Sequence, residues 1–505
     1  MSSELIRATG INSGLDTESI ISAYTSTASK RVQEAKNGKQ INEWTQDAWK
    51  DMNSKIYSFY SKTLSTNRLA SAYSKTKVTT SNDALSVVAG DNAVMGVQTA
   101  QIKETAKAAY LTGSKVAITK GTDNLSATLG IAAGQKITYM DKSGVEQTIQ
   151  IGGEATDGAT VVNTMDELVN ALKKAGVNAN FDTENQRLFL SAKNTGTEKD
   201  FSLGGDLDAL QKLGLATKAQ GGDAVKIDGA DAKLILNGAE FTSNTNSFNI
   251  NGSTYTINFL PENTDEQISV TTGRDYDAVY DVVKDMMKEY NNLVNEMSKL
   301  YNAASAKGYD PLTDEQKEAM TESQIEDWEE KIKGALLRND DTLYDVLSVM
   351  SNTTTQGFEV NGKKMYLSDF GISTMGYFEA EENERYALHI DGDEDDSNTA
   401  SKANKLKAMI ASDPEAVTSF FQQLSQSLYT NLYSKMGSTK LSSIYKVYND
   451  KQLDTEHDEW TKKIAELEQK LTDMEDRYYA QFSQMEVALS KMNSNQSAVS
   501  SMLGM

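Results

Sequence analysis

Apolar residues recur every three or four positions along the C-terminal end of the chain, with charged residues between them. These positions are Trp460, Ile464, Leu467, Leu471, Met474, Tyr478, Phe482, Met485, Leu489 and Met492. A similar spacing near the N-terminus joins Ile41, Trp44, Trp49, Met52, Ile56 and Phe59. Steps of three and four place side chains on one narrow stripe of a helix, which is typical of a coiled-coil seam. The pattern predicts two long helices that pair, and it indicates a structural or assembly role.

The middle of the chain shows the alternation of apolar and polar residues that is typical of strands. Asn237-Gly238, Asn251-Gly252 and Asn361-Gly362 each predict a tight hairpin, because Asn-Gly readily adopts the positive φ angles of such turns. Residues 141–144 connect another pair of strands. One helix interrupts the strands, with Thr164 as its N-cap and Gly176 at its end.

Signals for helix starts and ends divide the two terminal regions. A helix begins at Asp16 and runs to about Leu69, with a break near Asn37-Gly38, and helical patterning resumes at about Asp275. Two capping boxes, Thr313 with Gln316 and Thr321 with Gln324, predict further helix starts. The pair Asp413-Pro414 predicts another start. The range from Leu441 to Met492 is predicted to be mostly helical.

Helices, strands and helices again along the chain predict an α+β multidomain protein. Both chain ends form a discontinuous coiled-coil leg, and β-rich head domains are inserted into it. The predicted leg domain contains residues 41–75, 274–350 and 400–474, and the first head domain contains 76–112, 226–273 and 351–399. Residues 113–225 form an inserted second head domain, and residues 1–40 and 475–505 form terminal helices.

The chain of 505 residues is acidic, with 50 Lys and Arg against 72 Asp and Glu. This balance argues against binding to nucleic acid or to an anionic membrane surface. Residues 309–396 hold seven basic and twenty-three acidic side chains. A well-solvated surface is the simplest interpretation of such a stretch.

The absence of cysteine excludes disulfides, thiolate nucleophiles and cysteine-ligated zinc. The N-terminal residues lack the apolar segment of a secretory signal, and no apolar run of about eighteen residues predicts a membrane span. Export by another route is therefore expected if the protein leaves the cell.

Candidate chemistry is sparse. His389 and His457 fit no metal-ligand spacing, so both are interpreted as surface or packing residues. Ser74 and Lys77 fit Ser-x-x-Lys, but the partner motifs of serine acyl-enzymes are missing. Asp391, Asp393 and Asp395 alternate as in a calcium loop without its glycine and final glutamate, which favours a solvated acidic loop. We predict no enzyme activity, no metal and no cofactor.

Several segments resemble the flagellar filament cap family, also called the hook-associated protein 2 family. They are Ile11 to Ile21 (INSGLDTESII), residues 71–83 (SAYSKTKVTTSND), residues 309–317 (YDPLTDEQK), 326–331 (EDWEEK), 337–340 (LRND), 367–373 (LSDFGIS) and 412–417 (SDPEAV). Residues 164–196 also resemble a module of flagellins and hook-associated proteins. The acidic run from Asp391 to Asp396 is not a feature of that family.

The resemblance implies an extracellular protein at the distal tip of the bacterial flagellum, exported through the flagellar channel without a cleaved signal. It implies self-association into a plate with legs, contact with flagellin during its folding and insertion, and an export chaperone at the C-terminal end. Adhesion to a host glycan or protein through the head domains is an alternative. A secreted glycan-cleaving enzyme is a third, which lacks a recognisable site.

Two sets of residues are expected to carry the assembly role. Within the leg, Trp460, Ile464, Leu467 and Leu471 are predicted to pack against Trp44, Trp49, Met52 and Ile56. Ile20, Ile21, Met485, Leu489 and Met492 are predicted to contact the filament. The outer ends, residues 1–36 and 485–505, are expected to be mobile in the isolated subunit because their helices have few apolar partners.

Overall fold

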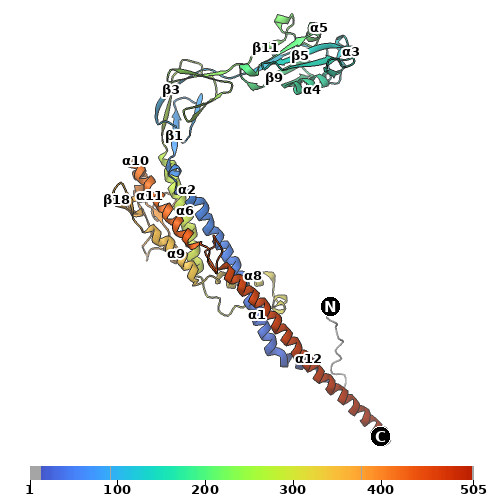
Figure 1. Cartoon of the computed structure of the whole chain (residues 1–505), viewed down its shortest axis with the longest axis vertical. Coiled ribbons are helices and arrows are strands. Elements are labelled where there is room, and N and C mark those ends of the chain that lie inside the picture. Colours follow the sequence, from blue (N-terminus) through green and yellow to red (C-terminus); the bar gives the residue numbers. More distant parts are fainter. Residues whose placement is uncertain (1–12, 91–92, 377, 503–505) are drawn as a thin grey trace. The chain divides into compact units, whose positions relative to one another are not determined.

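The structure is a computed structural model that describes residues 13–90, 93–376 and 378–502. It separates into a helical unit, Met1–Tyr73 with Tyr276–Met505, and a strand-rich unit, Ser74–Asp275. Both chain ends therefore meet in one unit, and the strands form an insertion between them (Figure 1). The predicted α+β fold with paired terminal helices is confirmed. The parts of the terminal predictions that fall on residues 1–12 and 503–505 lie outside the described residues.

Eleven helical segments make up most of the helical unit as the structure describes it. They are α1 (Thr17–Ser58), the π-helix η1 (Phe59–Leu64), α2 (Ser65–Asn67), the 3₁₀-helix η2 (Ala70–Tyr73), α6 (Tyr276–Tyr301), α7 (Asp314–Glu318), α8 (Glu322–Gly334), α9 (Asp341–Thr354), α10 (Lys405–Ser412), α11 (Pro414–Lys435) and α12 (Asp450–Met502). Between α9 and α10 lie β17 (Phe358–Val360), β18 (Lys363–Met365), η5 (Leu367–Phe370), β19 (Ile372–Ser373), η6 (Glu382–Glu384) and β20 (His389–Ile390).

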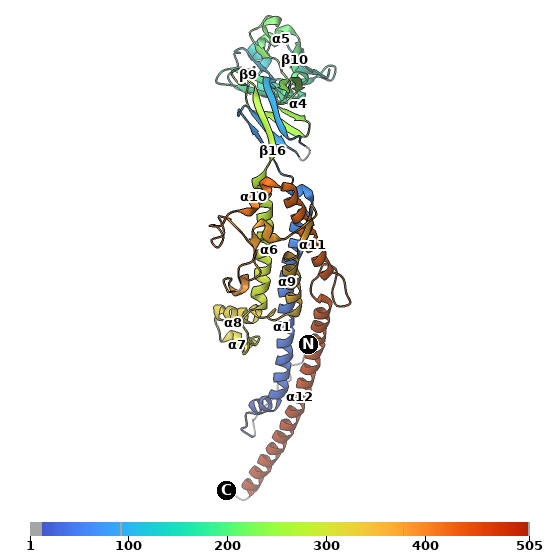
Figure 2. The ribbon, with the colours of Figure 1, turned by 90° about the vertical axis from the view of Figure 1, so that its left-hand side faces the viewer.

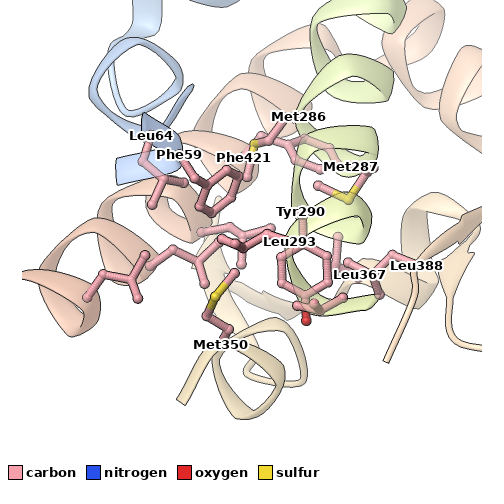
Figure 3. Packing of buried hydrophobic residues seen from close by; sticks show 14 of the residues in the cluster. Phe59, Leu64, Met286, Met287, Tyr290, Leu293, Met350, Leu367, Leu388 and Phe421 are labelled. Carbon is pink, nitrogen blue, oxygen red and sulfur yellow. The ribbon is translucent and has the colours of Figure 1, made fainter. Parts of the chain in front are cut away.

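The core of the helical unit forms where η1, α6, α9 and α11 pack together. Figure 3 shows Tyr290 and Met286 of α6 close to Phe421 of α11 and to Phe59 and Leu64 of η1. All five side chains are buried. Burial of large apolar groups is the main favourable term in folding, so this cluster fixes the helices to which the leg is attached.

The segment 351–399 belongs to this helical core and not to a head domain, which corrects the predicted boundary. Phe358 contacts Phe420 of α11 edge to face, with ring centroids 5.5 Å apart. Phe370, Ile372 and Ile390 are buried in the same cluster. The prediction misassigns the short β17–β18 and β19–β20 hairpins because their apolar residues face helices, which sequence alternation alone does not reveal.

The strand-rich unit contains two hydrophobic clusters. The first lies in the sheets of order β1-β16-β3-β12-β13 and β14-β15-β2, and the second lies between β10-β5-β6-β7 and β11-β4-β9-β8 with their helices. The strands are β1 (Thr76–Thr80), β2 (Leu85–Ala89), β3 (Gly96–Glu104), β4 (Ala108–Thr112), β5 (Gln135–Asp141), β6 (Glu146–Ile151), β7 (Thr160–Val162), β8 (Val177–Asp182), β9 (Arg187–Thr195), β10 (Phe201–Gly205), β11 (Val225–Ile227), β12 (Ala232–Leu236), β13 (Ala239–Ser243), β14 (Ser247–Ile250), β15 (Ser253–Ile257) and β16 (Ile268–Arg274). The helical segments are α3 (Leu125–Leu129), α4 (Met165–Ala175), η3 (Thr197–Lys199), α5 (Leu207–Lys212) and η4 (Lys218–Gln220).

The second cluster runs from Ala109 to Ala224, close to the predicted insertion of residues 113–225. Strands β4 and β11 pair with each other and β4 also pairs with β9, so the edges of this insertion lie a few residues outside the predicted ones. The predicted limits of the insertion follow a change in amino-acid composition. In the structure, the pairing of β4 with β9 and β11 decides which strands belong to the insertion.

Local turn and cap signals predict the structure well. Asn237 and Gly238 have φ angles of 52° and 86° between β12 and β13, and the Asn251 and Asn361 turns likewise have positive φ. Thr164 caps α4 by accepting a hydrogen bond from the Glu167 N–H. Both predicted capping boxes are present.

Two predicted helix boundaries are wrong. Helix α1 continues through Asn37 and Gly38 without a break, and α12 begins at Asp450 instead of near Leu441. The residues between α11 and α12 form a connection that contains a left-handed Tyr445, φ 64°. We call residues 437–449 the α11–α12 connection below.

Candidate functional site

Helices α1 and α12 lie side by side in both views of the molecule and run in opposite directions (Figures 1 and 2). The ring of Tyr24 stacks on that of Tyr478 with centroids 5.3 Å apart. Further along the pair, Lys36 Nζ lies 2.7 Å from Glu468 Oε1. Asn42 is buried and donates from its amide to Glu456. These contacts define an antiparallel pair, which we call the leg.

A glycine in α1 fixes how closely the two helices approach. A methyl group built on Gly38 would lie 2.7 Å from Cζ2 of Trp460, so the indole occupies the space that a side chain would need. Trp460 is therefore seated on the bare backbone of α1. This contact explains why α1 has a glycine at a mid-helix position where alanine would form a better helix.

The predicted face-to-face packing of the two residue sets is corrected by this register. Trp49 stacks on Tyr448 with a centroid distance of 5.3 Å and an interplanar angle of 7°. Trp44 lies beneath the Lys333 ammonium group, 4.8 Å from the ring centroid. Met52 and Ile56 are buried in the core of the helical unit. Trp49, Met52 and Ile56 thus connect α1 to that core. Trp44 contacts α8 through Lys333, and Trp460 packs over Gly38.

The α12 side of the leg is only half covered. Ile464, Leu467 and Leu471 are each half-buried, and the residues between them are exposed. In a pair of helices, each partner covers only one side of the other helix's apolar seam. In coiled coils of three or more helices, the additional helices cover the remaining side. The seam of α12 therefore has apolar surface available for another helix.

The outer ends of the leg differ between the two helices. Ile21 is buried and Ile20 is half-buried near the start of α1. Helix α12 continues to Met502, past the level of Ser13, whose backbone N–H and hydroxyl donate to Glu486. Beyond this point Leu489 is half-buried, and Met492 is 65% exposed. We call residues 487–499 the α12 overhang.

His457 lies on α12 among carboxylates. Its Nε2 is 3.2 Å from Glu43 Oε1 of α1, and its Nδ1 is 3.7 Å from Asp458. These groups border a hollow of about 560 Å³ that Trp44 also lines. The arrangement joins the two leg helices and offers no activated nucleophile.

The acidic run is tied to the helical unit by basic side chains. Lys284 Nζ of α6 lies 2.5 Å from Asp393 and 2.6 Å from Asp395, and His389 Nδ1 lies 2.6 Å from Asp396. The Lys284 hydrogen bond lowers the pKa of Asp395. Burial alone would raise the pKa of Asp396, but hydrogen bonds from His389 and Asn398 lower it overall. The run is thus a loop held by ion pairs.

The part of the chain that the structure describes has neither a cluster of metal-ligating side chains nor a bilayer-crossing helix. Three or more His, Asp or Glu side chains do not gather there in a way that would hold a metal ion. The helices of the same residues lack the length and apolar character needed to cross a bilayer.

Two features of the helical unit are absent from the sequence-based predictions. The first is the π-helix η1, which carries Tyr60 against Tyr429 with ring centroids 4.2 Å apart. The second is Asn53, a buried side chain that holds the α11–α12 connection. Its Nδ2 donates to the Tyr445 carbonyl at 3.2 Å, and its Oδ1 accepts from the Val447 N–H at 3.0 Å. The sequence does contain a signal for Asn53, because this polar residue lies on the apolar stripe of α1.

Comparison with known proteins agrees with this architecture. Residues 229–494 match the family model "Flagellar hook-associated protein 2 C-terminus", and residues 13–109 match the corresponding N-terminus model. Flagellar hook-associated protein 2 of Halalkalibacterium halodurans is 24% identical over 97% of this chain and 98% of its own length. The protein of that name from Escherichia coli K12 is 24% identical over 97% of each chain.

A solved structure supports the fold. The crystal structure of a three-domain fragment of the Escherichia coli flagellar cap protein matches with a TM-score of 0.52 at 17% identity, covering 82% of this chain and 99% of that one. The match shows that the two chains share a fold at low sequence identity. Because the C-terminus model alone spans more than half of the sequence, the chain belongs to the flagellar hook-associated protein 2 family.

Proposed function

We propose that this protein is a non-catalytic cap at the distal tip of the bacterial flagellar filament. In this role the chain is exported through the flagellar channel, associates with copies of itself, and promotes folding and insertion of arriving flagellin. An export chaperone binds its C-terminal end before export. Family membership supports the cap role, as does the likeness of the fold to the Escherichia coli flagellar cap protein.

The observation that carries this proposal is the half-covered leg. Helix α12 has an apolar seam open to another helix, and its overhang continues past the described start of α1. A helix with an uncovered apolar stripe gains stability when a partner helix covers it. Flagellin helices at the growing end of the filament would supply such a partner, and Met485, Leu489 and Met492 are the residues proposed to contact them.

Filament growth in the source bacterium tests this proposal. Cells that carry the triple variant Met485→Ser, Leu489→Ser, Met492→Ser in place of the native chain are expected to export flagellin into the medium without extending filaments. The control is Lys462→Ser, Glu466→Ser, Lys470→Ser, which changes three exposed charged positions of the same helix. Filaments should grow normally with the control.

Two results would count against the proposal. Normal filaments with the apolar triple variant would show that Met485, Leu489 and Met492 are not needed for contact with the filament. Normal filaments in cells that lack the chain altogether would remove the cap role itself. Amounts of exported variant chain are measured in parallel, so that an export defect is recognised.

A second candidate function, adhesion, has one observation in its favour. Tyr110 lies opposite Ile227, and Thr112 lies opposite both Val225 and Phe189, so these side chains share one face of the β11-β4-β9-β8 sheet. Their four large apolar members are 39% to 60% exposed. Apolar patches of this kind often bind a partner. Deleting residues 113–220 should then abolish attachment to host cells and leave filament growth intact, and unchanged attachment would exclude this role.

A further inference from the structure

A group of exposed apolar side chains surrounds the α11–α12 connection. It consists of Tyr57, Tyr433, Leu441, Ile444 and Tyr445, which are 39% to 53% exposed. The Tyr445 ring meets Tyr57 edge to face with centroids 5.5 Å apart, and Tyr433 lies 6.5 Å from Tyr445. We call this group the tyrosine patch. Contiguous exposed apolar surface of this kind often forms an interaction site.

The patch rests on two uncommon backbone features. The π-helix η1 begins two residues after Tyr57, and Tyr445 has a left-handed φ of 64°, which is rare for a bulky side chain. Asn53 holds the strained segment through its hydrogen bonds to residues 445 and 447. Strained backbone that the surrounding structure maintains is concentrated at functional sites. One feature directly follows the helical turn of Tyr57, and the other is the backbone of Tyr445 itself.

The edge of the patch is basic. Lys440 and Lys446 lie on the α11–α12 connection itself, and Lys62 is exposed on η1. The phenol hydroxyls of the patch can donate hydrogen bonds, and the ammonium groups carry positive charge. The chemistry of this surface therefore fits a partner that presents carboxylates on a rigid element.

The same chain presents such an element at α8. Glu326, Asp327 and Glu330 are exposed, whereas Ile332 is buried and Trp328 is half-buried on the opposite face. Trp328 joins α8 to the segment before α7, because its Nε1 donates to the Asp310 carbonyl at 2.8 Å and its ring meets that of Tyr309. We call the outward face of α8 the acidic arm.

The acidic arm and the tyrosine patch are attached to opposite faces of α1. The arm contacts α1 through Lys333 over the Trp44 ring, and the connection is held by Asn53. The two anchors, Trp44 and Asn53, are nine residues apart, which is about two and a half turns of an α-helix. The half turn places them on opposite sides of α1, roughly 14 Å apart along its axis. Figure 2 shows α7 and α8 on one side of α1 and the segment after α11 on the other. Opposed complementary surfaces suit a head-to-tail contact between copies.

We propose that the acidic arm of one copy of this chain docks on the tyrosine patch of the next copy. In this contact Glu326 and Glu330 face Lys440 and Lys446, and the tyrosine hydroxyls donate to the remaining carboxylates. A head-to-tail contact of this type forms a ring when its rotation closes. The inference rests on the proposed cap function and adds to it a specific interface within the helical units.

A charge exchange tests the interface. Sedimentation velocity of the full-length chain measures self-association for three variants: Lys440→Glu with Lys446→Glu, Glu326→Lys with Glu330→Lys, and all four together. Each pair alone is expected to weaken association about tenfold or more, because like charges then face each other. The variant with all four substitutions should recover association, because the facing charges are again opposite. Salt should weaken the wild-type contact.

The control reverses charge at two exposed lysines of the strand-rich unit, Lys120→Glu with Lys193→Glu, and should leave association unchanged. Equal association of the wild type and all variants would overturn this interface and leave the cap function standing. Loss in both pairs without recovery in the fourfold variant would also overturn it. A wild-type chain that is monomeric at every concentration would overturn the interface and the proposed cap function together.

Discussion

The indole of Trp460 on α12 occupies the space beside Gly38 on α1 where a β-carbon would otherwise lie. The contact sets the register of the leg, because a larger residue at position 38 would hold the helices apart. The indole also covers the backbone of α1 at Gly38, and the helix continues through this glycine without a break.

The first prediction concerns this contact. Gly38→Ala is expected to destabilise the leg by about 1–3 kcal/mol through overpacking, although alanine at an open helical position stabilises by about 1 kcal/mol. In a Trp460→Ala background the same substitution should become stabilising. Urea unfolding followed by tryptophan fluorescence measures both, because all four tryptophans lie in the helical unit. If Gly38→Ala changed the free energy of unfolding in the same direction in both backgrounds, the Trp460 indole would not set the distance between α1 and α12.

The second prediction concerns Asn53. Replacing it by alanine leaves the Val447 N–H and the Tyr445 carbonyl without their side-chain partner in a buried place. We expect a loss of about 1–3 kcal/mol in the free energy of unfolding. Lys440→Ala at an exposed position of the same connection serves as control and should change stability by less than about 0.5 kcal/mol. A loss no larger than that of the control would contradict the role of Asn53.

The third prediction is a pH dependence at the acidic loop. Lys284 lowers the pKa of Asp395, so their ion pair contributes fully above the ordinary aspartate pKa of about 3.9 and is lost as pH falls through the lowered value. Lys284→Met should therefore raise the midpoint of the Asp395 carboxyl titration, as followed by carbon NMR. Lys288→Met, one turn further along α6, should raise it less. An unchanged midpoint in both variants would sink the assignment.

The fourth prediction concerns the ends of the leg in the isolated subunit. Residues 18–30 have α12 as their helical partner, whereas residues 49–56 of the same helix place Trp49, Met52 and Ile56 in the core of the helical unit. Amides 18–30 should thus exchange with solvent much faster than amides 49–56. Hydrogen exchange of the monomer measures this directly. Equal protection of the two segments would refute the expected mobility.

Local signals in the sequence predict local structure well. The Asn-Gly turns, the α4 cap and the two capping boxes each depend on backbone conformations that few residues satisfy, so a short motif is enough. The long amphipathic helices are predictable for the same reason, because a sustained stripe has one interpretation.

The register of the leg could not be predicted in this way. Seams with steps of three and four match each other in several alignments, and the choice among them depends on Gly38, Asn42 and the Lys36–Glu468 pair. The tyrosine patch escapes prediction because Tyr57, Tyr433 and Tyr445 come from separate segments. The β17–β18 and β19–β20 hairpins are misplaced because their apolar side chains face helices that lie far from them in sequence.

The cap account is tested most directly by locating the chain on intact flagella. A peptide tag in the exposed turn at residues 154–158 of the strand-rich unit is labelled with gold and viewed by electron microscopy. The account predicts one cluster of label at the distal end of each filament in tagged cells that still grow filaments. Label spread along the filament, or confined to its base or to the cell surface, would contradict it.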